Sequence, residues 1–125
     1  MKHLVSFETA KALKEAGYPQ PDFETGQVWY TLDGLPHIKL ARKWQFLNLE
    51  SGGIWLLGID PEKRFYAPSA TEIMEHRTMR LCTCDCWGYD PVRWKCADHE
   101  TKRTTLAESL AEAAAQMFIE KNAKP

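Results

Sequence analysis

The chain has 125 residues, of which 44% are hydrophobic, and its 16 Lys and Arg stand against 17 Asp and Glu. Such a length and composition are typical of one domain that buries a core without disulfides or metal ions. The net charge of −1 lacks the basic excess of most nucleic-acid-binding proteins, and no apolar window approaches the ~18 residues of a membrane span. We therefore expect a cytoplasmic protein whose four cysteines are reduced thiols.

The first predicted element is an amphipathic helix from Phe7 to Ala16. Its apolar residues recur at the spacing of one helical face. Ser6 is a suitable N-cap, because its hydroxyl can accept a hydrogen bond from a free N–H of the first turn. Gly17 stands where a left-handed residue commonly ends a helix, and Pro19 and Pro21 then exclude its continuation.

Four extended segments follow the helix and predict an antiparallel meander of three or four strands. Asp33 and Gly34 between the first two segments favour a two-residue hairpin turn. Pro36 indicates that the second strand begins late or lies at the edge of the sheet. The segments are Gln27–Leu32, Leu35–Ala41, Trp44–Leu49 and Ile54–Ile59, and the last is closed by a turn at Asp60–Lys63.

A short helix and a second hairpin are predicted next. Ser69 and Glu72 form a capping-box pattern at the start of the helix. The two strands of the hairpin are Met79–Trp87 and Val92–His99. A turn near Asp90 would join them.

The last predicted helix runs from Thr105 to Asn122, with Thr105 and Glu108 as its capping box. The complete order is a helix, a β-meander, a short helix, a β-hairpin and a helix, without the alternation of parallel α/β folds. This order predicts a single α+β domain over residues 1–125, with helices packed on one face of an antiparallel sheet.

Two segments of the chain carry a resemblance, VSFETAKALKEAGYPQP at 5–21 and YAPSATEI at 66–73, together with the Ala-rich last helix. They resemble a family of short uncharacterised proteins from phages, prophages and other mobile elements of Bacteroides-type bacteria. The resemblance implies an accessory protein in the cytoplasm of a bacterial host. It supplies no catalytic motif, cofactor or ligand, and the Cys-rich strand is not a feature of that family.

The four cysteines form the most distinctive chemical pattern. Cys82, Cys84 and Cys86 alternate along one predicted strand, and Cys84 lies opposite Cys96 if the turn centres near Asp90. Alternate residues of a strand are ~6.6 Å apart, whereas two sulfurs on tetrahedral zinc are ~3.8 Å apart. The pattern favours small buried side chains under the last helix. The alternatives are zinc or another thiophilic metal bound by the four thiols, and a Cys84–Cys96 disulfide or redox pair.

An enzymatic function is not expected. A nucleophilic cysteine would need His76 or His99 as its base, and Asp98 is the only neighbour that could orient His99. No phosphate-binding loop, nucleophile elbow or metalloprotease helix is present. We expect His3, His37 and the other two histidines at surface or half-buried positions.

Basic residues beside tryptophans are candidates for binding single-stranded nucleic acid, because aromatic side chains can stack on bases. They are Arg42, Lys43, Arg93 and Lys95. All five tryptophans fall in predicted strands, however, where aromatic side chains commonly form cross-strand pairs. Nucleic acid is therefore not the expected partner.

The remaining hypothesis is a protein-interaction module without catalytic activity or cofactor. Its partner is a protein of unknown identity, with a second copy of the chain as an alternative. The candidate contact surfaces are the sheet edge near Pro36 and the side chain of Ile119, which falls outside the apolar stripe of the last helix. A small zinc-binding or single-stranded nucleic-acid-binding domain is the alternative function.

Overall fold

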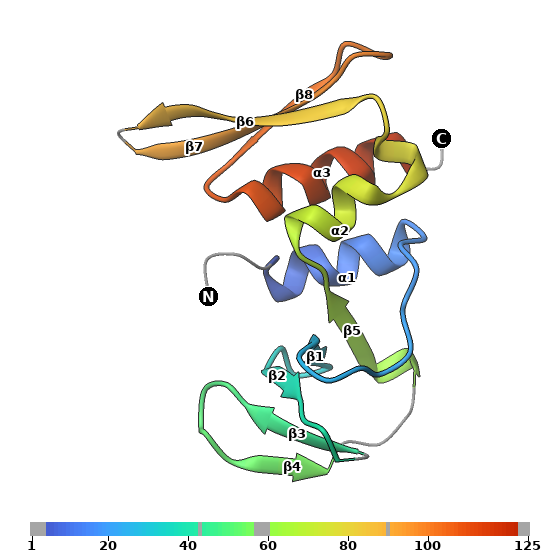
Figure 1. Cartoon of the computed structure of the whole chain (residues 1–125), viewed down its shortest axis with the longest axis vertical. Helices are drawn as coiled ribbons and strands as arrows, with labels where there is room; N and C mark the ends of the chain where they lie inside the picture. The colour runs from blue at the N-terminus through green and yellow to red at the C-terminus, as the bar shows by residue number, and fades with distance from the viewer. Residues whose placement is uncertain (1–4, 43, 57–60, 90, 123–125) are drawn as a thin grey trace.

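In a computed structural model of the chain, a layer of helices lies between two antiparallel sheets (Figure 1). The structure describes residues 5–42, 44–56, 61–89 and 91–122. The α+β class predicted from the sequence is confirmed, and the strands divide between two sheets. The elements are α1 (Phe7–Glu15), β1 (Val28–Thr31), β2 (Pro36–Lys39), β3 (Gln45–Asn48), β4 (Ile54–Leu56), η1 (Pro61–Lys63), β5 (Arg64–Ala67), α2 (Ala70–Glu75), η2 (Arg77–Met79), β6 (Cys82–Tyr89), β7 (Val92–Asp98), β8 (Thr104–Ala107) and α3 (Leu110–Asn122).

The larger sheet has the strand order β4-β3-β2-β1-β5. The predicted meander supplies β1 to β4, although residues 57–59 and Asp60 of the last predicted strand and turn lie outside the described residues. Strand β5 is not among the predicted strands; it is a run of four residues that returns to pair with β1. So short a run carries too little alternation to be recognised without its partner strand.

Pro36 opens β2, which lies inside this sheet between β1 and β3. A strand can begin with proline because the missing N–H is then tolerated at the end of the ladder. The late start is confirmed, whereas the edge position is wrong. The predicted interaction surface at a sheet edge near Pro36 is therefore also wrong, since β4 and β5 form the edges.

The turn between β1 and β2 contains three residues instead of the predicted two. The Thr31 N–H donates to the Leu35 carbonyl at 3.2 Å, and the Gly34 N–H donates to the Thr31 carbonyl at 2.9 Å. Gly34 has a φ of +84°. A type I turn followed by a left-handed residue is the common three-residue hairpin loop, and glycine adopts that conformation without steric cost.

The N-terminal helix α1 matches its prediction closely. Ser6 is the N-cap and accepts a hydrogen bond from the Thr9 N–H, and Gly17 follows the helix with a φ of +95°. Ala10 and Leu13 are buried. In α2 the predicted capping box between Ser69 and Glu72 is also present.

The last helix begins later than the sequence predicted, at Leu110 of α3 instead of Thr105. Thr105 does not cap a helix but lies in β8, paired with Cys96 of β7. The N-cap hydroxyl of α3 belongs to Ser109, which accepts from the Glu112 N–H at 3.1 Å. The pairing partner of β8 decided between strand and helix, and a local capping pattern cannot show such a partner.

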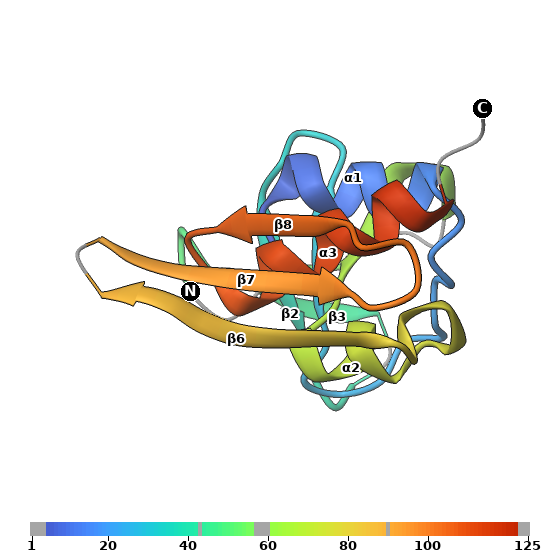
Figure 2. The ribbon, with the colours of Figure 1, turned by 90° about the horizontal axis from the view of Figure 1, so that it is seen from above.

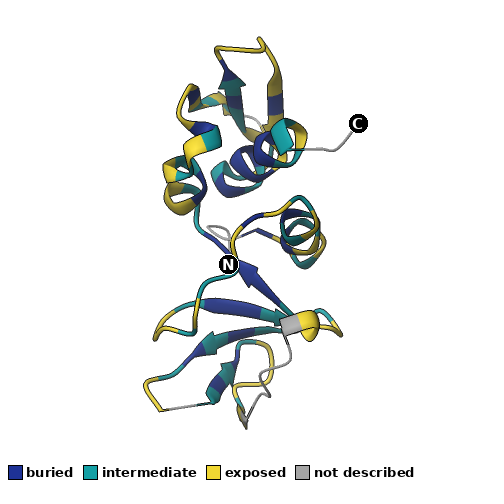
Figure 3. Ribbon diagram, turned by 90° about the vertical axis from the view of Figure 1, so that its right-hand side faces the viewer, coloured by how far each residue is buried: buried dark blue, intermediate teal, exposed yellow. Residues whose placement is uncertain are grey.

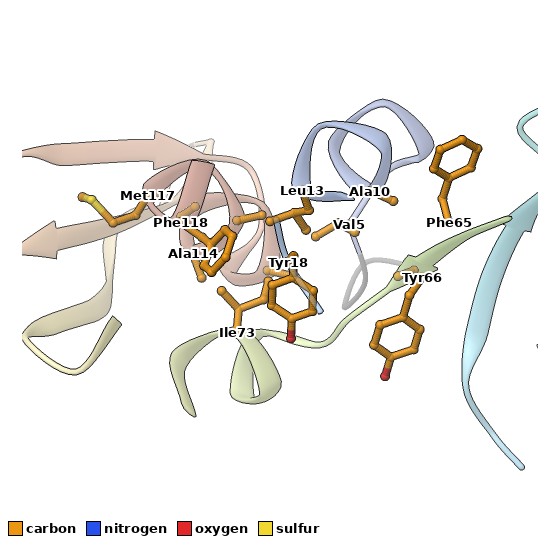
Figure 4. Packing of buried hydrophobic residues seen from close by; sticks show 14 of the residues in the cluster. Val5, Ala10, Leu13, Tyr18, Phe65, Tyr66, Ile73, Ala114, Met117 and Phe118 are labelled. Atoms are coloured by element: carbon orange, nitrogen blue, oxygen red, sulfur yellow. The ribbon is translucent and has the colours of Figure 1, made fainter. Parts of the chain in front are cut away.

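The helices share one hydrophobic cluster with both sheets (Figures 3 and 4). Helix α1 contacts β5 on one side and α3 on the other. Its Phe7 packs edge-on against Phe65 of β5, with ring centroids 5.5 Å apart. Tyr18 after α1 packs in the same way against Phe118 of α3 at 5.2 Å. The half-buried Ile119 also packs against this cluster, although its spacing in the sequence placed it outside the apolar stripe of α3. Its role as a contact residue stays a prediction.

Candidate interaction surface

The smaller sheet consists of the long β6–β7 hairpin and β8, with β7 in the middle. Its register is the one expected for the two predicted strands, and Cys84 lies directly opposite Cys96 as predicted. A β-bulge interrupts the ladder because Cys86 pairs with Trp94 and Gly88 pairs with Arg93, so that Trp87 is the extra residue. Bulges increase the local twist and re-aim the strand beyond them.

The end of this hairpin projects past the rest of the molecule (Figure 2). Strand β8 pairs with β7 only from Trp94 to Ala97, and α3 packs under the same part of the sheet. We call the projecting part the hairpin arm and define it as residues 87–89, 92 and 93. A two-stranded ribbon by itself is only marginally stable in water. Packing against another surface would therefore stabilise an arm of this kind.

The hairpin arm carries large apolar side chains that are open to solvent. Trp87 is 61% exposed, Tyr89 is 84% exposed and Val92 is 49% exposed. Leu106 of β8 is also 45% exposed, whereas the 49% exposed Leu81 precedes β6, at the opposite end of that strand from the arm. Large exposed apolar side chains that gather in one place are typical of interaction sites, whereas single ones are ordinary.

The predicted basic candidates lie at different places. Arg93 is an exposed residue of the hairpin arm, and Lys95 is half-buried opposite Asp85 on β6. Arg42 is exposed in the β2–β3 connection, at the opposite end of the long axis in Figure 1. Lys43 lies outside the described residues. The described candidates therefore form no continuous basic patch.

All four cysteines are free thiols. The Cys82 Sγ lies 3.7 Å from a carboxylate oxygen of Asp98, and the Cys86 Sγ lies 3.6 Å from the Gly88 carbonyl. Burial raises the pKa of the Cys82 thiol. The hydrogen bond with Cys84 raises the pKa of Cys96, and the same bond lowers that of Cys84.

The described residues contain no group of three or more His, Cys, Asp or Glu side chains placed to hold a metal ion. The predicted set of Cys82, Cys84, Cys86 and Cys96 is thus divided by the fold. Cys82 and Cys96 are buried, whereas Cys84 and Cys86 are half-buried at alternate positions along β6. Each of the three β6 thiols contacts a different neighbour, because the strand separates alternate side chains.

The residues considered for nucleophilic catalysis have structural partners. The His99 Nε2 lies 2.9 Å from the Thr83 hydroxyl, and the His76 Nδ1 lies 2.9 Å from the Thr78 hydroxyl. The Asp98 carboxylate accepts hydrogen bonds in the turn before β8 and from Lys121 of α3, at 3.2 Å for the latter. Asp98 therefore anchors a turn and does not orient His99.

His37 corrects another expectation, because it is fully buried. Its Nδ1 lies 3.0 Å from the Leu35 carbonyl, and its Nε2 lies 3.3 Å from the Asn48 Nδ2. The amide oxygen of Asn48 accepts from the N–H groups of Glu50 and Ser51. Asn48 must then donate to the ring, which makes His37 a neutral imidazole with its proton on Nδ1.

The hairpin arm was not recognised as a site from the sequence. A usable signal was present, since Trp87, Tyr89 and Val92 flank the predicted turn at the far end of both strands. Side chains near a long hairpin's turn extend beyond any covering helix. The shortness of β8 is what leaves them uncovered here.

The fold and surface define a small α+β protein with a projecting β-hairpin that exposes Trp87, Tyr89 and Val92. Exposed apolar side chains also occur on the larger sheet, at Leu32, Ile54 and Trp55. No protein-family model, curated protein or solved structure matches the chain. Within the described ranges, no helix combines the length and apolar character needed to cross a membrane.

Proposed function

We propose that this chain is a protein-interaction module without catalytic activity, which binds another protein through its hairpin arm. The carrying observation is the exposure of Trp87 and Tyr89, at 61% and 84%, on a ribbon that projects past β8 and α3. Trp and Tyr are the side chains that most often dominate binding energy at protein interfaces.

The chemistry of the hairpin arm defines its partner. Trp87, Tyr89 and Val92 would enter an apolar groove, where each aromatic side chain can bury ~150–250 Å². The exposed Arg93, opposite Gly88 on the same arm, would meet a carboxylate or backbone carbonyls at the rim of that groove. The partner is thus a folded protein with an apolar groove and an acidic rim.

The biological setting is part of the same proposal. The resemblance of residues 5–21 and 66–73 to phage and mobile-element proteins supports an accessory role in a bacterial cytoplasm. The free state of all four thiols also supports a reducing compartment. In that setting the module would act by occupying a surface of a host or phage protein.

A site-specific crosslinking experiment tests the proposal. A photoreactive amino acid replaces Tyr89 in one variant and Leu32, 59% exposed on the β1–β2 turn, in a control variant. After irradiation in the bacterial host, we expect a discrete crosslinked protein from the Tyr89 position only. That protein is then purified, and its affinity for the unmodified chain is measured by calorimetry.

The double variant Trp87→Ala/Tyr89→Ala should bind the purified partner at least ~100-fold more weakly, since each hot-spot truncation costs ~2 kcal/mol or more. Leu32→Ala should bind it as the unmodified chain does. Equal affinity of the double variant and the control would refute the role of the hairpin arm. Salt-sensitive binding to single-stranded nucleic acid that the double variant loses would replace the protein partner with a nucleic acid.

A further inference from the structure

Three sulfur-containing side chains lie close together where α2 contacts the β6–β7 hairpin. The Cys84 Sγ of β6 lies 3.5 Å from the Met74 Sδ of α2. Cys96 of β7 is the residue directly opposite Cys84 in the ladder, so the two side chains lie on the same face of the hairpin. The three sulfur-containing side chains come from three separate elements, with Cys84 contacting Met74 and facing Cys96 across the ladder.

We propose that Cys84, Cys96 and Met74 form a binding site for a soft monovalent metal ion, copper(I) above all. Thiolate and thioether sulfurs are the ligands that select copper(I) among biological metals. This site goes beyond the proposed interaction function, since it uses none of the exposed side chains of the hairpin arm.

The spacing of the sulfurs fits direct coordination. Two sulfurs that bind one ion at ~2.3 Å are ~4.0 Å apart in a trigonal, three-coordinate arrangement. The Cys84 and Met74 sulfurs, at 3.5 Å, need to move apart by only about 0.5 Å. Side chains on directly opposite strand residues have Cβ atoms ~4.5–5.5 Å apart, which also allows their sulfurs to share one ion.

The ligand set favours copper(I) over zinc. Structural zinc takes four ligands from Cys, His, Asp and Glu, and a methionine thioether is not among them. The described part of the chain places no third His, Cys, Asp or Glu with this cysteine pair as a potential ligand. Two thiolates and one thioether make a three-coordinate site for a soft ion that tolerates low coordination.

The surroundings provide both access and retention. Cys84 and Met74 are half-buried and so can be reached from the surface, whereas Cys96 is fully buried. On binding, both thiols release their protons to the buffer and three sulfur–copper bonds form. No electron is transferred, because copper enters and stays in the monovalent state.

Anaerobic titration tests the site, with copper(I) supplied as its bicinchoninate complex to the fully reduced chain. We expect one copper(I) per chain, with sulfur as the only ligand atom in X-ray absorption spectra. Met74→Leu preserves the volume of the side chain and removes the thioether. It should weaken binding by at least ~tenfold, since even outer-shell partners of metal ligands contribute 10–100-fold. Cys84→Ser should abolish stoichiometric binding.

Cys86→Ser is the matched control, because Cys86 lies two residues along β6 and its Sγ contacts the Gly88 carbonyl instead of the cluster. It should keep the affinity of the unmodified chain. Equal losses in Cys86→Ser and Cys84→Ser would show unspecific thiol binding and overturn the site. An unchanged affinity in Met74→Leu would overturn it as well, and circular dichroism of each variant establishes that the fold is retained.

Discussion

Glu112 on α3 accepts a hydrogen bond from the Thr9 hydroxyl on α1, with 2.6 Å between the oxygens. Its other carboxylate oxygen accepts from the Ser6 N–H at 2.5 Å. Ser6 is the N-cap of α1, and Glu112 is the residue whose own N–H the Ser109 cap of α3 receives. One carboxylate thus joins the N-terminal ends of two helices 103 residues apart, where the helix dipole favours a negative charge.

Removing this carboxylate should destabilise the fold. Glu112→Ala is expected to lower the free energy of unfolding by about 1–3 kcal/mol, because hydrogen bonds to charged groups contribute about that amount. Urea denaturation measures the change. Glu108→Ala, an exposed position four residues earlier, should change the free energy by less than about 0.5 kcal/mol. Equal effects of the two changes would show that the Glu112 contacts contribute nothing.

A substitution at Thr105 tests whether this residue lies in strand β8 or, as the sequence predicted, at the start of the last helix. Its buried hydroxyl donates to the Ala113 carbonyl of α3 at 2.7 Å. Thr105→Val keeps the shape of the side chain and should cost about 1 kcal/mol, the usual contribution of one hydrogen bond. The exposed neighbour Thr104 serves as the control, and Thr104→Val should be nearly neutral or slightly stabilising in a strand. The reverse order of the two effects in thermal unfolding would contradict this assignment.

Alanine substitutions at Gly34 and Gly52 distinguish the cost of backbone strain from the cost of a steric contact. Both have positive φ, +84° and +74°, so alanine at either position is strained by about 1–2 kcal/mol. A Cβ at Gly34 would also lie 3.2 Å from the Phe7 Cδ2, whereas a Cβ at Gly52 meets nothing within 4 Å. Gly34→Ala should therefore destabilise the chain more than Gly52→Ala. Chemical denaturation of the two variants side by side checks this order, which an equal loss would contradict.

Stability should fall as the pH decreases through about 6.5. Burial lowers the pKa of His37 and of His76 below the ordinary value of 6.5. The unfolded chain therefore takes up protons first, which favours unfolding by up to about 1.4 kcal/mol per pH unit for each histidine. Denaturation at pH 7.5 and pH 5.5 measures the slope. His37→Gln should reduce that slope, whereas His99→Gln at an exposed position should keep it; an identical slope in both variants would exclude His37 as a cause.

Local features of the fold were predictable from the sequence. Helix α1, its Ser6 cap and the Ser69–Glu72 capping box depend on residues within a few positions of one another, and all are present. The Cys84–Cys96 register was predictable for the same reason, because one short turn sets the pairing of a hairpin. The α+β class followed from the order of these local elements.

Features that depend on distant partners were not predictable. Strand β5 exists because β1 lies beside it, and Thr105 is in a strand because β7 offers a free edge. Ile119 is half-buried because the core extends to its side of α3. A local pattern of apolar and capping residues does not contain these partners, so the same residues were compatible with another assignment.

The sequence by itself determined the caps of α1 and α2, the β6–β7 pairing and the α+β class, because short-range hydrogen bonds and turn residues specify them. The tertiary structure alone decided which surfaces remain free. It left Trp87 and Tyr89 on the hairpin arm beyond the reach of β8 and α3, and it placed the Met74 sulfur beside Cys84. The physical reason is that exposure and convergence are properties of packed elements, which depend on where each element ends relative to its neighbours.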